Sequence, residues 1–480
     1  MSFDDHHSLV GLIAILASPI AIFVLFSSLT STSRALIVTI LGAQMLLPVG
    51  TFIKIPMVPQ LDKTSIASFS ALLALLVFGR RRPEPRRNGI GLVELLIILY
   101  IAGPIITSTL NSDAIVVGDR VLPGVGLYDA LSAALNTLVV LIPFFLGRRF
   151  LNSADDCRDI LRILAIAGLL YSIPLLFEIR FSPQLHYWIY GYYSHEFVQA
   201  MRDNGFRPMV FMGHGLLAAF FLMTSGLAAA ALSRAGSRLF STSLSLWAAY
   251  LDVVLWLCKS LGALVYGIAG TLLVGFTKPG TQIRVASLLV TISLMYPLLR
   301  TFELLPTDAV LGIAKSIDAD RAGSLEFRFN NEDMLARRAL ERPLFGWGRF
   351  GRSRIFDADN GSDVSVTDGR WIIDVGQFGI IGFLSEFGLL SICVYRAASA
   401  LRYAPSRKEQ QLLAALALIV SLNIFDLIPN SSLVPWTWLI SGALLGRAED
   451  LAYSRTLRRQ RTTTGSPSRI GSQPTAVLAG

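Results

Sequence analysis

The composition of this 480-residue chain is that of a protein surrounded by lipid. Hydrophobic residues make up 53% of the sequence, and the mean hydropathy is +0.57. A soluble domain has roughly 45–50% apolar residues and a strongly polar surface, so one water-surrounded core is excluded. The net charge of +9 does not indicate nucleic-acid binding, because the basic residues lie in short loops between apolar blocks instead of on one soluble domain.

Apolar blocks long enough to cross a bilayer recur along the chain. A helix rises about 1.5 Å per residue, so roughly 20 apolar residues span the hydrocarbon layer. The sequence predicts an all-α polytopic membrane protein with about 12–13 transmembrane helices and one large extracytoplasmic loop that carries short helices. The expected spans are 8–28, 34–50, 64–79, 90–110, 127–147, 159–179, 208–231, 244–258, 261–276, 285–302, 373–395, 410–428 and 433–447.

Two places leave the number of spans open. Residues 8–50 form either two spans or one span followed by a surface helix, because only Arg34 lies near their junction. Residues 244–276 are too long for one crossing and are interrupted only at Lys259-Ser260, which favours a tight helical hairpin.

Basic residues in the short loops predict the orientation, because cytoplasmic loops are enriched in Lys and Arg. The basic loops all fall on one side of the span list: Arg80–Arg82, Arg86/Arg87, Arg148/Arg149, Arg234/Arg238, Lys278/Arg284, Arg396–Lys408 and the tail from Arg447. We therefore expect helices 1–10 within residues 1–303, a large periplasmic loop at 304–372, C-terminal helices at 373–447 and a disordered cytoplasmic tail at 448–480.

The first candidate site residues lie after an outer loop that contains Asp203. Pro208 suits the first turn of a helix, and Arg207 and His214 are seven residues apart, so a helix there would place both on one face. That face could point into a cavity. Alternatively, Arg207 reaches the membrane interface and His214 bonds to a neighbouring helix. The preceding loop 181–202 is rich in Tyr, Trp and His, which is typical of an interfacial aromatic belt and, less often, of a sugar platform.

The 304–372 loop carries the densest charge. Asn330 or Asn331 is expected to cap a helix that runs to Arg342 and stops at Pro343. Arg338 and Arg342 would then repel one another at i,i+4 spacing, and a bound anion would relieve this; the alternative is a solvated helix face. The Gly-rich stretch 343–351, which contains Trp347, suggests a pocket wall.

Further along, Glu386 lies inside a predicted span and needs a partner, while Gly379 and Gly382 would permit close helix packing. Asp357-Ala-Asp359 and Asp318-Ala-Asp320 could coordinate a cation, but acidic loops beside many Arg residues are usually ion pairs. We therefore predict neither a metal nor a cofactor.

These segments resemble the bacterial O-antigen ligase and polysaccharide polymerase superfamily, whose members share many spans and one large outer loop between late helices. The similarity covers about residues 60–447. It is carried by Phe206–Gly215, Lys259–Ala263, Arg328 with Ala339–Gly348, Asp368–Trp371, and Gly379–Gly388. Asp368 stands where ligases commonly carry His-Asn, which favours an exopolysaccharide repeat-unit polymerase.

The resemblance implies a glycosyltransferase of the bacterial inner membrane whose donor is an undecaprenyl-diphosphate-linked oligosaccharide. Expected partners are the lipid bilayer and a chain-length regulator or export complex. Arginines suit the diphosphate because they stay charged and bind its oxygens bidentately. The residues expected to act in catalysis are Arg207, Arg328 and Asp368, with Asp363 and Glu326 as rivals of Asp368 for the acceptor base. Substrate-binding roles are expected for His214, Arg338, Arg342, Trp347 and Arg370.

Three alternatives remain open at this stage. The protein could be an O-antigen ligase, a transporter of lipid-linked glycans, or a scaffold subunit of an export complex. Transporters usually carry internal repeats and charges in both halves. This sequence gathers its charge in one loop instead.

Overall fold

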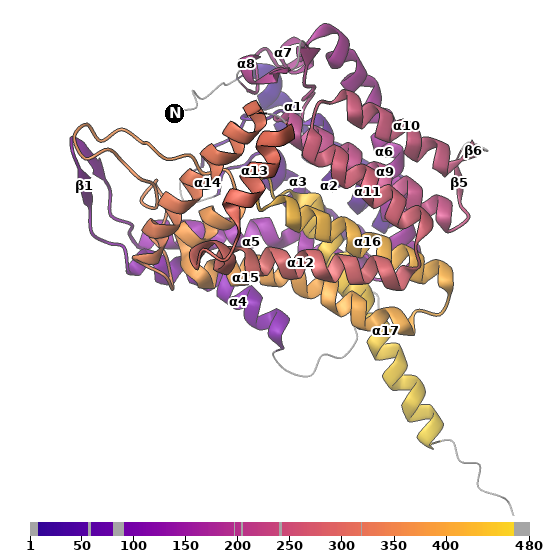
Figure 1. Ribbon diagram of the computed structural model, residues 1–480. Helices are drawn as coiled ribbons and strands as arrows, with labels where there is room; N and C mark the ends of the chain where they lie inside the picture. The colour runs from indigo at the N-terminus through magenta and orange to yellow at the C-terminus, as the bar shows by residue number, and fades with distance from the viewer. Residues whose placement is uncertain are drawn as a thin grey trace, which may run out of the picture.

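The computed structural model describes residues 8–55, 59–79, 91–195, 197–202, 205–239, 242–317 and 319–464. Within these ranges the regular structure is almost entirely helical, and the strands form short two-stranded antiparallel hairpins (Figure 1). The elements of the first half are α1 (Leu9–Ser28), α2 (Thr32–Leu46), α3 (Lys63–Phe78), α4 (Leu92–Thr109), β1 (Ile115–Val117), β2 (Arg120–Leu122), α5 (Leu127–Phe150), α6 (Ala154–Phe181), α7 (Leu185–Tyr190), α8 (Phe197–Ala200), β3 (Met201–Arg202), β4 (Gly205–Phe206) and α9 (Gly215–Arg234).

The second half continues the helical pattern. Its elements are β5 (Arg238–Leu239), β6 (Thr242–Ser243), α10 (Leu244–Leu257), α11 (Leu261–Phe276), α12 (Pro279–Thr301), α13 (Thr307–Ile317), α14 (Ala319–Leu340), α15 (Arg370–Ala400), the 3-10 turn η1 (Leu401–Tyr403), α16 (Arg407–Asp426) and α17 (Pro435–Thr464).

Every predicted span overlaps a helix, although α9 begins seven residues after the predicted start at 208. Eight of the described helices are long and apolar enough to cross a membrane: α1, α4, α5, α6, α9, α12, α15 and α16. Helices α2, α3, α10 and α11 are apolar but shorter. The described part of the chain is therefore that of a predominantly helical, multi-pass membrane protein.

The two ambiguous stretches each form two helices. Helix α2 starts after Ser31, whose hydroxyl accepts a hydrogen bond from the Arg34 N–H. The 244–276 stretch breaks where Lys259 adopts a left-handed backbone conformation (φ 54°), and α10 and α11 both pack against α9. The predicted break at Lys259-Ser260 is confirmed.

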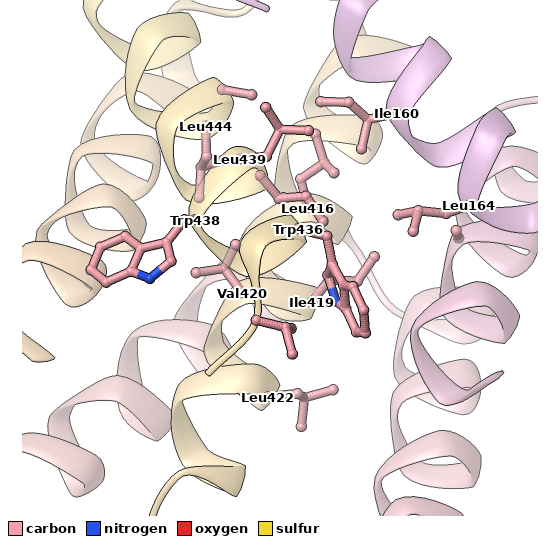
Figure 2. Close-up of a cluster of buried hydrophobic side chains, with 14 of the residues drawn as sticks. Ile160, Leu164, Leu416, Ile419, Val420, Leu422, Trp436, Trp438, Leu439 and Leu444 are labelled. Carbon is pink, nitrogen blue, oxygen red and sulfur yellow. The ribbon is translucent and has the colours of Figure 1, made fainter. Parts of the chain in front are cut away.

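The centre of the bundle is formed by α9, α16 and the first half of α17. Figure 2 shows Trp436 and Trp438 of α17 beside Leu416, Ile419 and Val420 of α16, and both indoles are only 1% exposed. Helix α17 also crosses α5 closely, since a Cβ at Gly442 would lie 2.1 Å from the Phe144 carbonyl oxygen. Small residues let membrane helices approach in this way.

The predicted disorder from residue 448 is wrong for residues 448–464. These residues continue α17, which extends beyond the other helices in Figure 1. Contacts with the α16 end of the bundle hold this part: Arg447 forms ion pairs with Glu409 and Asp450, and Arg455 donates to the Tyr403 hydroxyl. Residues 465–480, and the basic cluster at Arg80–Arg87, lie outside the described residues.

The segment between α12 and α15 contains α13 and α14, which lie over the ends of α12 and α15 (Figure 1). Helix α14 begins at Ala319, well before the expected cap, because residues 319–330 include helix-favouring Ala, Arg, Leu and Glu. Asn331 is thus a buried interior residue, and its side chain donates to the Phe327 carbonyl and accepts from the Val366 N–H. The predicted cap at Asn330 or Asn331 is wrong.

Candidate functional site

A cavity of about 170 Å³ lies where α14 meets the ends of three membrane helices. Its walls come from the last turns of α12, from α14, from the start of α15 and from the residues after α16. The lining residues are Tyr296, Leu325, Arg328, Phe329, Glu332, Val366, Asp368, Ile372, Ile428 and Pro429. Arg328 is the one Lys or Arg in this set, so it supplies the positive charge on the cavity wall.

Arg328 and Asp368 meet at this cavity. The Arg328 Nε lies 3.3 Å from the Asp368 Oδ2, and the two side chains are 37% and 40% exposed. Arg328 projects from the middle of α14, while Asp368 lies just before α15 begins. The structure thus brings together two of the three residues that we expected to act in catalysis, and it leaves both accessible to a ligand.

Glu332, which the sequence reasoning missed, lines the cavity one helical turn after Arg328. Its carboxylate accepts hydrogen bonds from the Tyr296 hydroxyl at 2.9 Å and the Trp371 indole N–H at 3.3 Å. Burial raises the pKa of Glu332 above its ordinary value, although Tyr296 and the nearby Arg300 partly oppose that shift. Its i,i+4 spacing from Arg328 was the available signal, because it predicts a shared helix face.

Arg300 fixes α14 onto α12. Its guanidinium donates to Asp333 at 2.6 Å and to the Phe329 carbonyl at 3.1 Å. The same group lies 3.3 Å from the Glu332 carboxylate. Arg300 is 7% exposed, so it positions the cavity wall and is not free to bind a ligand.

Arg207 and His214 do not share a helix face. Helix α9 begins at Gly215, with His214 as its N-cap: the His214 Nδ1 accepts the Leu216 N–H at 3.0 Å. Arg207 is buried in the preceding coil and donates to the Lys259 carbonyl at 3.1 Å. Neither residue lines the cavity of Arg328 and Asp368. The helical placement of Pro208 is therefore wrong, and Asp203 lies outside the described residues.

Helix α6 explains why the residues before α9 form coil instead of the predicted helix. The Glu178 carboxylate accepts the N–H groups of Met209 and Val210, each at 2.8 Å, and the Tyr171 hydroxyl accepts that of Phe211 at 3.0 Å. Val210 also adopts a left-handed conformation (φ 50°). Side chains of a neighbouring helix therefore satisfy these amides and hold the coil inside the protein, where irregular backbone is tolerated.

Arg338, Arg342 and Trp347 come together as a stacked cluster. The guanidinium carbons of Arg338 and Arg342 lie 3.4 and 4.3 Å from the centroid of the Trp347 ring. Arg338 also pairs with Glu341 at 2.6 Å, and Arg342 donates to the Asn111 side chain at 2.5 Å. The predicted repulsion between the two arginines is thus relieved by the indole face and by acceptors within the protein.

The Gly-rich motif that contains Trp347 is wedged into a break in α15. The Pro343 carbonyl accepts the Ile380 N–H, and the Trp347 N–H donates to the Gly376 carbonyl, at 2.8 and 2.9 Å. Gly379 has φ 67°, and a Cβ there would lie 2.3 Å from the Leu344 carbonyl carbon. Gly379 therefore permits close approach of this loop, not of another helix as predicted. The motif does not line the cavity of Arg328 and Asp368.

Arg370 pairs with the buried Glu386 instead of lining that cavity. Its Nε and Nη2 donate to the two oxygens of Glu386 at 2.7 and 2.6 Å, and Asp374 lies 3.1 Å from the same guanidinium. The Tyr100 hydroxyl also donates to Glu386. Glu386 thus has the partner that the sequence required, and Arg370 is used inside the bundle.

The two rival carboxylates lie elsewhere. Asp363 pairs with Arg354 at 2.5 Å; burial alone would raise its pKa, but hydrogen bonds from Arg354 and Ser365 lower it below the ordinary value. Glu326 lies 3.5 Å from Lys315 of α13. Neither lines the cavity, so Asp368 is the best-placed base candidate.

Of the two acidic pairs that could coordinate a cation, Asp357 and Asp359 lie in a local turn. Asp357 accepts the N–H groups of Asp359 and Asn360, which makes a local turn. Asp318 lies outside the described residues. Within the described ranges, no group of three or more His, Cys, Asp or Glu side chains could hold a metal ion.

The aromatic loop divides into a packed part and an exposed part. His186 is buried, with Nδ1 2.9 Å from the Tyr192 carbonyl and Nε2 accepting the Val49 N–H at 3.2 Å. Burial lowers the pKa of His186 to about 4. Tyr187, Trp188 and Tyr193 are exposed, as either a belt or a sugar platform requires.

Comparisons with known proteins add no relative. No protein-family model matches the chain, and no curated protein is significantly similar to it in sequence. The functional assignment therefore depends on the geometry described above and on the resemblance in the motifs.

Proposed function

We propose that this protein is a metal-independent membrane glycosyltransferase that polymerises undecaprenyl-diphosphate-linked oligosaccharide units into a bacterial surface polysaccharide or exopolysaccharide. The observation that carries the proposal is the accessible Arg328–Asp368 pair at the cavity beneath α14. In the proposed orientation, α13 and α14 lie on the periplasmic side of the inner membrane and the end of α17 is cytoplasmic.

The chemistry needs a cation for the leaving diphosphate and a base for the acceptor. Arg328 is charged at any relevant pH and suits phosphate oxygens. When the diphosphate binds Arg328, the Asp368 carboxylate loses its resting partner and becomes free to accept a proton. The acceptor hydroxyl oxygen then bonds to the anomeric carbon of the donor sugar and its proton passes to Asp368. The bond from that carbon to the diphosphate breaks, and the lipid diphosphate leaves with the electron pair.

The size of the cavity fits a reacting group and not a whole repeat unit. Sites for drug-sized ligands are roughly 300–1,000 Å³, whereas this cavity has about 170 Å³. The sugars of donor and acceptor would therefore extend outside it, and the lipid would lie against the helix bundle. Its position between a loop helix and the ends of membrane helices suits a substrate with one end in lipid and one in water.

The test is elongation by purified protein reconstituted in lipid. The protein is incubated with an isolated lipid-diphosphate repeat unit of its own pathway, and glycan length is followed by gel. Wild-type protein should give a ladder that Arg328→Ala abolishes. Intact protein that binds or moves the lipid-linked unit without lengthening it would instead indicate a ligase or a transporter.

Arg337→Ala is the matched control. Arg337 is exposed on the same helix, and nine residues of α-helix place it about 180° around the axis from Arg328. The proposal requires that Arg337→Ala keep the ladder. Equal loss in both variants would show that α14 needs its overall charge and not a specific contact from Arg328.

A further inference from the structure

Helix α13 carries apolar side chains on a face that no part of the described chain covers. Val310 and Ile313 are three residues apart and share a helix face, and their side chains are 38% and 64% exposed. The contact of α13 with α14 includes an ion pair instead, since Lys315 lies 3.5 Å from Glu326. Surface helices of soluble proteins have the reverse order, with apolar residues inward and charges outward. The outer face of α13 therefore suits an apolar neighbour.

The turn after α12 keeps the start of α13 at the end of that membrane helix. Glu303 adopts a left-handed conformation (φ 54°), and the N–H groups of Leu304 and Leu305 both donate to the Leu299 carbonyl, at 2.9 and 3.3 Å. Leu305 also packs against the buried core. Because the chain folds back onto the last turns of α12, α13 begins at Thr307 close to the level at which α12 ends.

A row of exposed apolar residues runs along α12 and continues past its end. Leu288, Ile292 and Met295 lie on one helix face and are 58%, 37% and 43% exposed. Helix α12 is long and apolar enough to span a membrane, so this row faces lipid. Phe302, seven residues after Met295, extends the row, and both Phe302 and Leu304 are 67% exposed. The lipid-facing surface thus continues into the turn that leads to α13.

The direction of α13 and the placement of its charges suit the surface of a bilayer. In Figure 1, α13 and α14 are steeply inclined to α12 and α16. The two charged residues of α13, Asp308 and Lys315, are seven residues apart and share a face. Asp308 is about 160° around the helix axis from Val310. An amphipathic helix of this kind lies in the membrane interface, with its apolar face roughly 5–10 Å into the boundary between headgroups and acyl chains.

We infer that α13 is an interfacial helix whose Val310 and Ile313 side chains lie in lipid beside the end of α12, and that this lipid contact holds α14 at the membrane surface. The one acid and one base of α13 leave it without net charge, so apolar contact holds it there and not attraction to anionic lipids. The inference concerns lipid contact and does not depend on the proposed enzymatic activity. It places the cavity of Arg328 at the level where the head of an amphiphile lies.

The first experiment measures which medium surrounds α13 in the full-length protein in lipid nanodiscs. A nitroxide spin label is attached to Ile313→Cys or Val310→Cys on the apolar face, and to Asp308→Cys as the matched control on the opposite face. Asp308 is exposed, as both test positions are. The three native cysteines are buried, and the wild-type protein measures background labelling.

Collisions with two reagents distinguish lipid from water. Oxygen concentrates in hydrocarbon, whereas a water-soluble nickel chelate is excluded from it. We expect the ratio of oxygen to nickel collisions to be severalfold higher at positions 310 and 313 than at position 308, because the apolar face is in the acyl boundary. This difference should be the same in phosphatidylcholine alone and in a mixture with phosphatidylglycerol.

Three outcomes would overturn the lipid contact. Similar ratios at the three positions would place the apolar face in water. Low collision rates with both reagents at positions 310 and 313 would mean that protein, such as a second copy of this chain, covers the face. A difference that exists only with phosphatidylglycerol would make anionic headgroups the binding partner instead of hydrocarbon.

The second experiment tests whether the contact holds α14. Hydrogen exchange is measured in nanodiscs for Val310→Ser/Ile313→Ser and for Asp308→Asn as the control. The double variant should exchange severalfold faster in the first half of α14, because local opening becomes less costly when the neighbouring helix leaves the lipid. The control should match the wild type. Unchanged exchange in the double variant would mean that α14 is held by its own contacts with α12 and α15.

Discussion

Two arginine–carboxylate pairs lie close together in the sequence but differ in the burial of their carboxylates. Arg328 and Asp368 approach at 3.3 Å in a cavity, with side chains 37% and 40% exposed. Arg370 lies 2.6 Å from Glu386; the Arg370 side chain is 28% exposed, but the Glu386 side chain is fully buried. Asp368 and Arg370 are separated by one residue, so the start of α15 divides an accessible pair from one that is part of the bundle.

The difference shows that residue type and motif position do not by themselves identify a binding group. A guanidinium whose hydrogen bonds are directed at a buried carboxylate cannot leave it without a large cost. A half-exposed pair contributes little to stability and can exchange its partner for a ligand. The buried pair is therefore expected to stabilise the fold, and the accessible pair to serve the reaction.

The largest effect is expected for Arg370→Ala. Removing this side chain leaves Glu386 buried without its bidentate partner, and such losses cost roughly 3–5 kcal/mol. The thermal midpoint of the detergent-solubilised protein should fall strongly, or the protein should fail to remain monodisperse. Arg396→Ala, at an exposed position of the same helix, should change the midpoint little. Similar midpoints for the two variants would remove the distinction between the pairs.

Next in size is the effect of Asp368→Asn on glycan elongation. The amide keeps the shape of the carboxylate but cannot accept the acceptor proton, so the rate should fall at least about 100-fold. The thermal midpoint should stay close to that of the wild type, since the ion pair is accessible. Asp359→Asn, an exposed residue of the same connection, serves as the control for loss of one negative charge. A large loss of stability in Asp368→Asn would make Asp368 structural, like Glu386.

A smaller effect on stability is expected for Gly379→Ala. The positive φ costs a non-Gly residue about 1–3 kcal/mol, and the new Cβ would press on Leu344. The wedge at 343–348 should loosen, and limited proteolysis should cut it faster. Gly388→Ala is the matched control, because its Cβ would meet Leu96 only at an ordinary distance of 3.5 Å. Equal proteolysis of both variants would show that the wedge does not depend on the break in α15.

The helices were predictable because hydropathy and length act locally. Each predicted span overlaps a helix, and the break at Lys259 followed from the length of the stretch and its polar interruption. The catalytic roles expected of Arg328 and Asp368 followed only from the motif resemblance, and their pairing was not predicted. No sequence spacing shows that α14 folds over the end of α15 to join them.

The errors arise where tertiary contacts override local signals. Pro208 was predicted to start a helix, but the Glu178 carboxylate of another helix accepts hydrogen bonds from the neighbouring backbone amides. Asn331 read as a cap, but it lies inside α14 and bonds to Val366. Gly379 was predicted to pack against another helix, but a loop packs against it instead. In each case the deciding partner is distant in the sequence, so periodicity could not reveal it.

The smallest expected effect concerns Glu332, which lines the cavity of Arg328 and whose side chain is 12% exposed. Its folded-state pKa is raised, first by burial, above an unfolded value of about 4.3. The unfolded chain therefore loses this proton at lower pH than the folded protein does. The stability that Glu332 contributes is complete below about pH 4.3 and is lost as pH rises through the folded pKa.

Glu332→Gln should remove this dependence while its amide oxygen can still accept from Tyr296 and Trp371. Thermal midpoints of the two proteins are measured from pH 4 upward. The midpoint of the variant should rise relative to that of the wild type as the pH rises. A difference that stays constant with pH would mean that Glu332 titrates as an exposed carboxylate. Water would then reach Glu332 inside the cavity of Arg328. Burial would no longer distinguish the residues of this site from those of the helix bundle.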